Sequence, residues 1–283
     1  MPRTIYVSMI PYNWRKTFDT FDVKILELLK KCTEGTPTVD DTRPLHIVLA
    51  SEYMFRRNPM SIVKKPKESK FLSDKSDVSK FPPPKSPTAD RRSYAHSIHS
   101  AAEKDQLIIR LCVATGGKNI MIVAGSIVWA EKEPVMAGSK VVTKGEVLNS
   151  SYIIYNGSVA CHYDKSLDVA ELDIYERDLF NFKPGDKQGG IFVADGLSFG
   201  IEICGDHGGI RHPSSTSTDT VQTLDIHMLV SDGASFASPA LRTGGYGLHC
   251  DRSACTVWQA DTSYAGRKRI TAGGNLTWTL ALD

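Results

Sequence analysis

Apolar residues occur along the chain in short runs, separated by polar segments that contain glycine and proline. Runs that alternate between apolar and polar residues, or that are apolar throughout, predict strands. They cover residues 5–10, 45–53, 119–130, 148–155, 158–165, 197–204, 226–230 and 255–260. Residues 18–32 and 94–112 instead carry the pattern of helices. Because strands and helices alternate, with two hairpin-like strand pairs, the sequence predicts a layered α/β protein with mixed sheets.

Three of the strand-like runs end at a side chain capable of chemistry. One run ends near Glu52, and a hairpin that turns at Asn156–Gly157 ends at Lys165. The sequence LSFGIEICGDHGG, residues 197–209, is apolar up to Cys204 and continues in glycines. This pattern is typical of a buried strand that stops in a sharp turn. Such a turn presents the cysteine side chain and the backbone N–H groups after it to a substrate.

These three side chains suit nucleophilic catalysis. A thiol attacks as the thiolate, so its ordinary pKa of about 8.5 must be lowered or a base must be supplied. Lys165 would favour the thiolate and stabilise an oxyanion, and Glu52 would carry the proton. Each residue also has an ordinary structural interpretation. Cys204 can be a small apolar residue of a core strand, and the other two can be solvated strand ends.

In order along the chain, these residues and their neighbours resemble the motifs of the nitrilase superfamily of carbon–nitrogen hydrolases, from Ile5 to about Asn275. The matching segments are IVLASEY around Glu52, IVAGSIV at 122–128, CHYDK at 161–165, FKPGD at 182–186, GIEICGD at 200–206, LDIHMLVSDGASF after them, and AGGNL at 272–276. The resemblance implies a four-layer α-β-β-α sandwich with two mixed sheets. It also implies a catalytic triad of Glu52, Lys165 and Cys204 that forms a thioester, with the backbone N–H of Gly205 in the oxyanion hole.

The same resemblance implies a small-molecule substrate, an amide rather than a nitrile, because the nitrilase branch usually carries tryptophan where Gly205 stands. The glycine is expected to widen the floor of the pocket. Many members have a second glutamate after the lysine, and here Glu171, Asp173 and Glu176 compete for that role, with Glu171 preferred. A homodimer is expected, and neither a cofactor nor a resident metal ion.

Candidates for substrate binding come from the strand ends and the loops that follow them. They are Tyr53, Arg56, His207, Ser235 and Phe236. Basic residues near the expected mouth of the site, Arg56 among them, are compatible with an acidic group on the substrate, but ordinary solvation explains such residues better.

Composition and charge narrow the class of protein further. The chain has 283 residues, of which 41% are hydrophobic and 23% charged, which fits a soluble globular protein. A single domain spanning residues 1–283 is ordinary for this length. The formal net charge of +2 gives no reason to expect nucleic acid or a membrane as a partner. Residues 63–92 hold seven lysines between Lys64 and Lys85, so a flexible surface excursion is expected there.

The cysteines and the N-terminus indicate in which cellular compartment the protein is expected. Six cysteines are scattered without a CxxC pair, which favours reduced thiols in the cytoplasm. The N-terminus lacks the long apolar stretch of a secretory signal. No apolar run approaches the ~20 residues that span a bilayer.

Three other functions remain open on the sequence. A metal-dependent phosphoesterase could use oxygen and nitrogen ligands from Asp206, His207, His212, Asp232 and His249. A papain-like hydrolase would pair Cys204 with a histidine, but its nucleophile normally begins a helix. A catalytically inactive binding protein on the nitrilase scaffold is the third alternative, and the intact triad argues against it.

Overall fold

The computed structural model describes residues 2–13, 21–33, 44–56, 98–138, 140–169, 171–172, 176–186, 190–210, 223–237, 240–261, 267–270 and 276–283. The lysine-rich segment 63–92 lies outside the described residues, as do Asp173, His212 and most of the AGGNL segment. None of the described helices has the length and apolar character that crossing a membrane requires.

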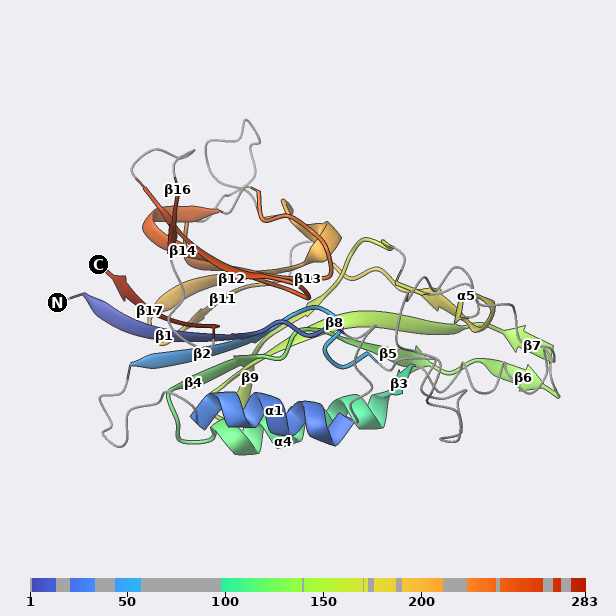
Figure 1. Ribbon diagram of the computed structural model, residues 1–283. Helices are drawn as coiled ribbons and strands as arrows, with labels where there is room; N and C mark the ends of the chain where they lie inside the picture. The colour runs from blue at the N-terminus through green and yellow to red at the C-terminus, as the bar shows by residue number, and fades with distance from the viewer. Residues whose placement is uncertain are drawn as a thin grey trace, which may run out of the picture.

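The first of two large sheets has nine described strands, in the order β17-β1-β2-β4-β8-β5-β3, with β9 and β10 also pairing with β8. Its central strands β1, β2 and β4 are parallel, and β17 pairs antiparallel with β1 (Figure 1). The strands are β1 (Arg3–Ile10), β2 (Leu45–Ala50), β3 (His99–Ser100), β4 (Ile120–Val123), β5 (Ile127–Lys132), β8 (Gly145–Tyr155), β9 (Ser158–Asp164), β10 (Phe180–Phe182) and β17 (Thr277–Leu282).

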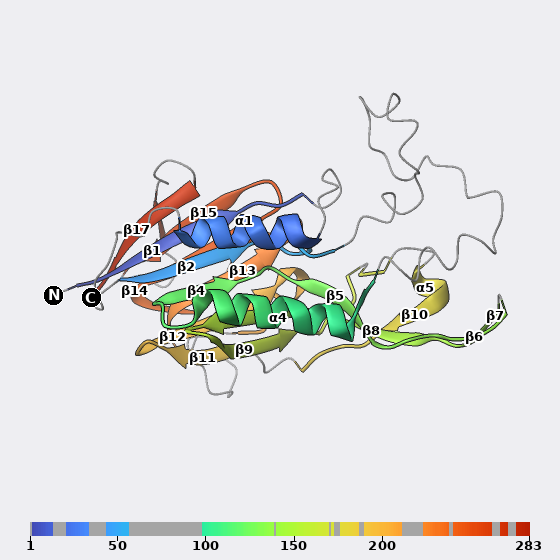
Figure 2. The same ribbon diagram turned by 90° about the horizontal axis from the view of Figure 1, so that it is seen from below.

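The second sheet has six described strands in the order β11-β12-β13-β14-β15-β16. Within it β12, β13 and β14 are parallel, whereas the outer pairs are antiparallel. Its strands are β11 (Ile191–Ala194), β12 (Leu197–Ile203), β13 (Leu224–Ser231), β14 (Leu241–Asp251), β15 (Cys255–Ala260) and β16 (Arg267–Ile270). A separate hairpin, β6 (Val135–Ala137) and β7 (Lys140–Thr143), projects from one end of the molecule (Figures 1 and 2).

Helices cover one face of the first sheet. The two long helices, α1 (Phe21–Thr33) and α4 (Ala101–Thr115), lie side by side across β2, β4 and β8, and the short α5 (Glu176–Leu179) lies near β10 (Figures 1 and 2). The second sheet packs on the opposite face. The described part of the chain is therefore a mixed α/β structure with a helix–sheet–sheet order. A helical layer outside the second sheet is not among the described residues, so the four-layer form of the sandwich stays a prediction.

Strand β2 shows how the sequence pattern produces these layers. All six of its residues are buried. Ile47 and Leu49 point into the core between the two sheets, where they join Phe199 and Met228. Val48 points to the opposite face and joins the core beneath α1 and α4. A strand covered on both faces must be apolar at every position, which is why LHIVLA shows no alternation.

Two predicted elements differ from the structure. The run 119–130 is two strands, β4 and β5, separated at Gly125, which has a φ of +70°. The helix expected over 94–112 begins instead at Ala101. Its start is fixed by a capping box, in which Ser100 and Glu103 bind each other's backbone N–H groups. The hairpin turn at Asn156–Gly157 is confirmed, with φ values of 48° and 83°.

Candidate active site

Glu52 lies in a tight turn directly after β2. The turn is held by the Ser126 hydroxyl, which accepts a hydrogen bond from the Tyr53 backbone N–H at 3.1 Å, and Tyr53 has a φ of 58°. Gly125 packs beneath it, since a Cβ at this position would lie 2.1 Å from the Ser51 carbonyl oxygen. The glycine–serine segment between β4 and β5 therefore shapes the turn that buries Glu52.

Lys165 follows β9 and is fixed by its backbone on both sides. Its N–H donates to the Asn149 carbonyl at 2.8 Å, and its own carbonyl accepts from the Gly185 N–H at 2.9 Å. Gly185 belongs to the FKPGD turn, and a Cβ there would lie 2.2 Å from the carbonyl oxygen of Asp164. The FKPGD turn thus presses directly against the end of the strand that carries Lys165.

The close approach at Gly185 predicts that Gly185→Ala moves Lys165. A methyl group 2.2 Å from a carbonyl oxygen is accommodated only if the turn or the end of β9 shifts. We expect a loss of about 1–3 kcal/mol in the free energy of unfolding together with slower turnover. The matched control is Gly116→Ala, where the new methyl would meet its nearest atoms at an ordinary 3.7 Å. Chemical denaturation and kcat/KM measure both effects, and wild-type values for the Gly185 variant would contradict this role.

Cys204 begins a short 3-10 turn, η2 (Cys204–Asp206), at the end of β12. Its φ is 45°, a left-handed conformation that is uncommon for any residue but glycine or asparagine. Ile203 before it is extended, and the Cys204 carbonyl accepts from the His207 N–H at 3.1 Å. The half-buried cysteine therefore sits at a sharp bend between strand and turn, as the glycines that follow it predict.

Asp206, two residues after Cys204, ties the cysteine turn to the lysine segment. Its carboxylate accepts hydrogen bonds from Tyr163 Oη at 2.6 Å, from the Ser166 N–H at 2.6 Å and from the Leu167 N–H at 2.9 Å. The Ser166 hydroxyl adds a further bond at 3.0 Å. Because the carboxylate is buried and bonded to residues on both sides of Lys165, it fixes the ends of β9 and β12 relative to each other.

The Lys165 ammonium lies between two buried carboxylates. Its Nζ donates to Glu52 Oε1 at 2.8 Å and to Glu171 Oε1. The Asn149 amide donates to the same pair, to Glu52 Oε1 at 3.1 Å and to Glu171 Oε2 at 2.8 Å, and Tyr53 Oη donates to Glu171 Oε2 at 2.7 Å. All three charged side chains are fully buried. The buried group therefore contains two carboxylates and one ammonium, which makes the protonation of Glu52 sensitive to its surroundings.

Burial raises the pKa of Glu52 to about 7. The Lys165 ammonium lowers this pKa, but the nearby charge of Glu171 opposes that effect. Burial acts on Lys165 in the opposite sense, but Glu52 and Glu171 together raise its pKa above the ordinary value, so the ammonium stays charged. Glu52 Oε2 has no hydrogen-bond partner among the described residues. This oxygen is therefore open to receive a proton.

Cys204 is a thiol, not a thiolate, near neutral pH. Burial raises its pKa to about 12, and the Glu52 charge adds to the effect, whereas Lys165 opposes it. The backbone N–H of Asp232, at the end of β13, donates to the sulfur and also lowers the pKa. A buried thiol of this kind needs a base to become a nucleophile, and Glu52 acts on it electrostatically at close range.

Two candidates for substrate binding, Tyr53 and Arg56, form hydrogen bonds to the segment that carries Glu171. Tyr53 holds Glu171, as described above. The Arg56 guanidinium is buried and donates to the Glu171 carbonyl oxygen and to Glu176 Oε2, each at 2.5 Å. These bonds fix the segment that carries Glu171. Glu176 is thus an ion-pair partner of Arg56, while Glu171 is the acidic residue that meets Lys165.

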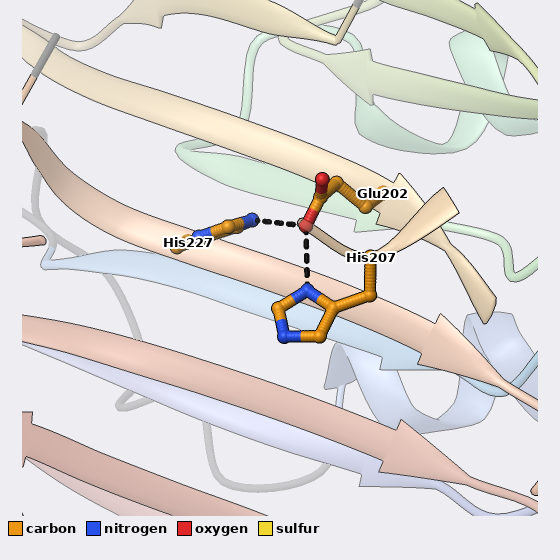
Figure 3. Close-up of side chains that lie close together, drawn as sticks. All are labelled: Glu202, His207 and His227. Atoms are coloured by element: carbon orange, nitrogen blue, oxygen red, sulfur yellow. Dashed lines mark hydrogen bonds and ion pairs between the residues drawn. The ribbon is translucent and has the colours of Figure 1, made fainter. Parts of the chain in front are cut away.

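Three further candidates lie around a cluster of histidines. Figure 3 shows Glu202, from β12, between His207 and His227, whose Nδ1 and Nε2 atoms lie 2.6 Å and 3.0 Å from Glu202 Oε2. Phe236 is buried and packs on His207 with ring centroids 5.0 Å apart, whereas Ser235 is exposed. The structure brings His207 and Phe236 together in this cluster, and none of the described contacts joins them to Glu52 or Glu171.

The donor pattern in this cluster fits a hydrogen-bond network. His207 Nε2 accepts from the Ala237 N–H and His227 Nδ1 from the Ala240 N–H, each at 3.0 Å. The other nitrogen of each ring therefore carries the proton and donates to Glu202. Burial would raise the pKa of Glu202, but these two donors lower it to about 2. A metal ion would need lone pairs where the rings carry N–H groups, so the residues do not fit a metal site as they stand.

The remaining metal-ligand candidates are engaged elsewhere. Asp206 is bonded to the lysine segment, and Asp232 Oδ1 accepts from Arg252 at 2.9 Å. His249 Nε2 lies 2.8 Å from the Ser231 hydroxyl. The described residues therefore do not gather these side chains around one point, as a metal-dependent phosphoesterase requires.

Gly205 allows a neighbouring loop to approach the cysteine turn. A Cβ at Gly205 would lie 2.6 Å from Cγ2 of Val169, a half-exposed residue of the segment after Lys165. The space that a larger residue would fill is thus partly occupied by Val169.

Several residues of the site were not identified from the sequence: Asn149, Asp206 as a positioning group, Ser126 and the Asp232 N–H. Asn149 did leave a signal, because it begins a polar triplet, Asn149–Ser150–Ser151, inside an otherwise apolar run, and all three residues are fully buried. A buried amide needs partners, which predicts a polar group opposite it. The Asp232 contact is made by the backbone and carries no sequence signal.

No protein-family model matches the sequence, and no curated protein sequence matches it. Solved structures do match. They include an amidase from Nesterenkonia sp., at 11% identity over 99% of this chain and 90% of that chain, with a TM-score of 0.43. Saccharomyces cerevisiae Nit3, a member of branch 10 of the nitrilase superfamily, matches at 12% identity over 99% and 90% of the two chains, with a TM-score of 0.46.

The glutamine-dependent NAD+ synthetase from Acinetobacter baumannii matches all of this chain at 10% identity, with a TM-score of 0.51. This chain spans only 46% of the synthetase chain, so the shared region is less than half of that protein. At such identities the likeness is one of fold. The synthetase match, with its TM-score of 0.51, shows that shared fold and nothing more specific.

Proposed function

We propose that this chain is a carbon–nitrogen hydrolase of the nitrilase superfamily that cleaves an amide through a thioester on Cys204. The observation that carries the proposal is the buried group in which Lys165 bridges Glu52 and Glu171 beside a cysteine held at a positive φ. Burying three charged side chains together carries a large desolvation cost, so such a group points to a functional role. Strained backbone also concentrates at functional sites.

In the first half of the reaction Glu52 takes the proton of Cys204 and the sulfur attacks the amide carbon. The carbon–sulfur bond forms as the carbonyl electrons move to oxygen. Lys165 has three N–H donors, of which two bind Glu52 and Glu171, so the third can hold the oxyanion with the backbone N–H of Gly205. The carbon–nitrogen bond then breaks, and the amine or ammonia leaves with the proton that Glu52 returns to it.

In the second half water attacks the thioester and Glu52 accepts its proton. The carboxylic acid product leaves and Cys204 recovers its proton. Glu171 takes part in this cycle through its contact with Lys165. Tyr53 and Asn149 hold it in place, and its charge keeps the lysine protonated and oriented.

The proposal predicts a defined pH dependence, measured as ammonia release from a panel of small amides and nitriles. Glu52 acts as a base only when ionised, so its raised pKa of about 7 determines the pH at which kcat/KM rises. We expect kcat/KM to be low at acidic pH and to rise with an apparent pKa near 7, about 2–3 units above an ordinary glutamate. Amides should be hydrolysed in preference to nitriles.

Two treatments distinguish the proposal from a metal-dependent hydrolase. Alkylation of thiols by iodoacetamide should abolish ammonia release, and a chelator should leave it unchanged. The opposite result, with activity lost to the chelator and retained after alkylation, would overturn the cysteine mechanism. A panel that shows no hydrolysis at all, with Cys204 inert to amides, would favour a binding protein on the same scaffold.

A further inference from the structure

Two cysteines outside the proposed mechanism face each other across a hairpin. Cys250 at the end of β14 and Cys255 at the start of β15 are direct partners in the antiparallel register, and their Sγ atoms lie 3.5 Å apart. The Asp251 N–H donates to the Ala254 carbonyl at 2.9 Å. Cys250 and Cys255 are therefore the adjacent, non-hydrogen-bonded pair, in which side chains approach most closely.

The backbone of such a pair suits a disulfide. Partner Cα atoms at non-hydrogen-bonded positions lie about 4.5 Å apart, inside the range of about 4.4–6.8 Å found for disulfides. The two sulfurs need only approach each other from 3.5 Å to a bond of about 2.05 Å. The bridge would close a very short loop, so it would add little stability through loop entropy and would remain reducible.

We propose that Cys250 and Cys255 form a reversible cross-strand disulfide, which makes this end of the hairpin a site of redox modification. The oxidant is a small-molecule disulfide such as oxidised glutathione. Cys255, which is 9% exposed against 0% for Cys250, attacks it and releases one glutathione thiol. Cys250 then attacks the mixed disulfide at the Cys255 sulfur and releases the second. Two protein thiols are oxidised, one glutathione disulfide is reduced, and two protons pass to the released thiols.

The pair is connected to both catalytic strand ends. Cys250 Sγ donates to the Ile10 carbonyl at 3.3 Å, and the same oxygen accepts from the N–H of Ser51, the residue before Glu52. On the other side Asp251 Oδ2 accepts from the Gly233 N–H at 2.6 Å. Gly233 follows Asp232, whose N–H binds the Cys204 sulfur. Oxidation removes the hydrogen bond from Cys250 to the Ile10 carbonyl and shifts the end of the β14–β15 hairpin. It therefore acts on the backbone next to Glu52 and on the backbone that contacts Cys204.

The effect of the disulfide on Cys204 rests on the proposed function. We expect oxidation of the pair to slow the reaction of Cys204. Neighbouring contacts that share partners couple strongly enough to change a rate by about threefold or more. The reactivity of Cys204 is measured as its rate of alkylation by iodoacetamide, which needs no knowledge of the substrate.

The test equilibrates the full chain in glutathione buffers from reducing to oxidising, blocks free thiols and digests with trypsin. Arg252 lies between the two cysteines, so cleavage gives peptides 243–252 and 253–267, which remain joined only if the disulfide has formed. We expect the linked pair to appear in oxidising buffer and to disappear with dithiothreitol. Cys255→Ser and Cys250→Ala should abolish it, whereas Cys112→Ser on α4 should not.

The rate of Cys204 alkylation is compared between wild type and Cys255→Ser in the same buffers. Direct reaction of glutathione with Cys204 occurs in both proteins. The difference between their alkylation rates therefore measures the effect of the Cys250–Cys255 disulfide alone. Slowing in the wild type but not in the variant supports the proposal. No linked peptide in folded protein at the most oxidising poise overturns the site, and a linked peptide with equal alkylation rates overturns its coupling to Cys204. Failure of the amide panel would leave the linked-peptide result unaffected.

Discussion

Cys204→Ala is expected to abolish hydrolysis while the protein keeps its fold. The alanine variant has no atom that can form the thioester, and removal of a catalytic nucleophile costs on the order of 10⁶ in kcat in a well-studied hydrolase. The side chain is only half-buried, so its loss removes little packing, and we expect the melting temperature to change by only a few degrees. Steady-state ammonia release and thermal melting measure the two effects.

Cys161→Ala is the matched control for this variant. Cys161 is also half-buried and lies on β9, close to the lysine segment but without a role in the mechanism. It should retain wild-type turnover. If the Cys204 variant hydrolysed the amide as fast as the control does, the nucleophile would have to be another residue.

Lys165→Met is expected to cost both activity and stability. It leaves Glu52 and Glu171 buried side by side without the ammonium between them, and breaking a buried ion pair from one side costs about 3–5 kcal/mol at neutral pH. Without Lys165 the pKa of Glu52 should rise further, because the ammonium no longer opposes the effects of burial and of the Glu171 charge. The destabilisation is then largest at high pH and shrinks as pH falls and Glu52 takes up a proton.

Urea denaturation of the Lys165→Met variant at several pH values tests this account. If the variant fails to fold at neutral pH, the measurement is made near pH 5, about where ordinary carboxyls begin to protonate. Lys183→Met is the control, because Lys183 pairs with Glu131 at the surface and its loss should leave activity unchanged. An equal effect of the two substitutions, or a destabilisation of Lys165→Met that grows toward low pH, would contradict the buried charge arrangement.

The strands that carry the site follow from the sequence because local pattern determines them. An apolar run covered on both faces, a two-residue hairpin turn and a strand that stops in glycines each have a local signature, and β2, the β8–β9 hairpin and β12 match them. The resemblance to a known family supplied what local pattern could not, the expectation that Glu52, Lys165 and Cys204 converge. The structure joins Glu52 to Lys165 and places Cys204 within electrostatic reach of both.

The supporting residues could not be predicted because their roles depend on contacts distant in sequence. Asp206 meets Ser166 across 40 positions, and Asn149 meets Glu52 across 97. Arg56 read from the sequence as a surface cation, but its ion pair with Glu176 depends on a segment 120 residues away. The break at Gly125 was also missed, since an isolated glycine in an apolar run does not reveal that the Ser51 carbonyl lies against it.

The thioester on Cys204 is tested by intact mass spectrometry of the protein, quenched with acid during turnover of the best amide in the panel. We expect an adduct whose added mass equals that of the acyl group of the amide. Peptide mapping should place it on Cys204, and hydroxylamine should release it as thioesters require. The adduct should be absent from Cys204→Ser treated in the same way. Continued hydrolysis with no acyl group on Cys204 at any quench time, together with turnover by the Cys204→Ala variant, would rule out Cys204 as the nucleophile.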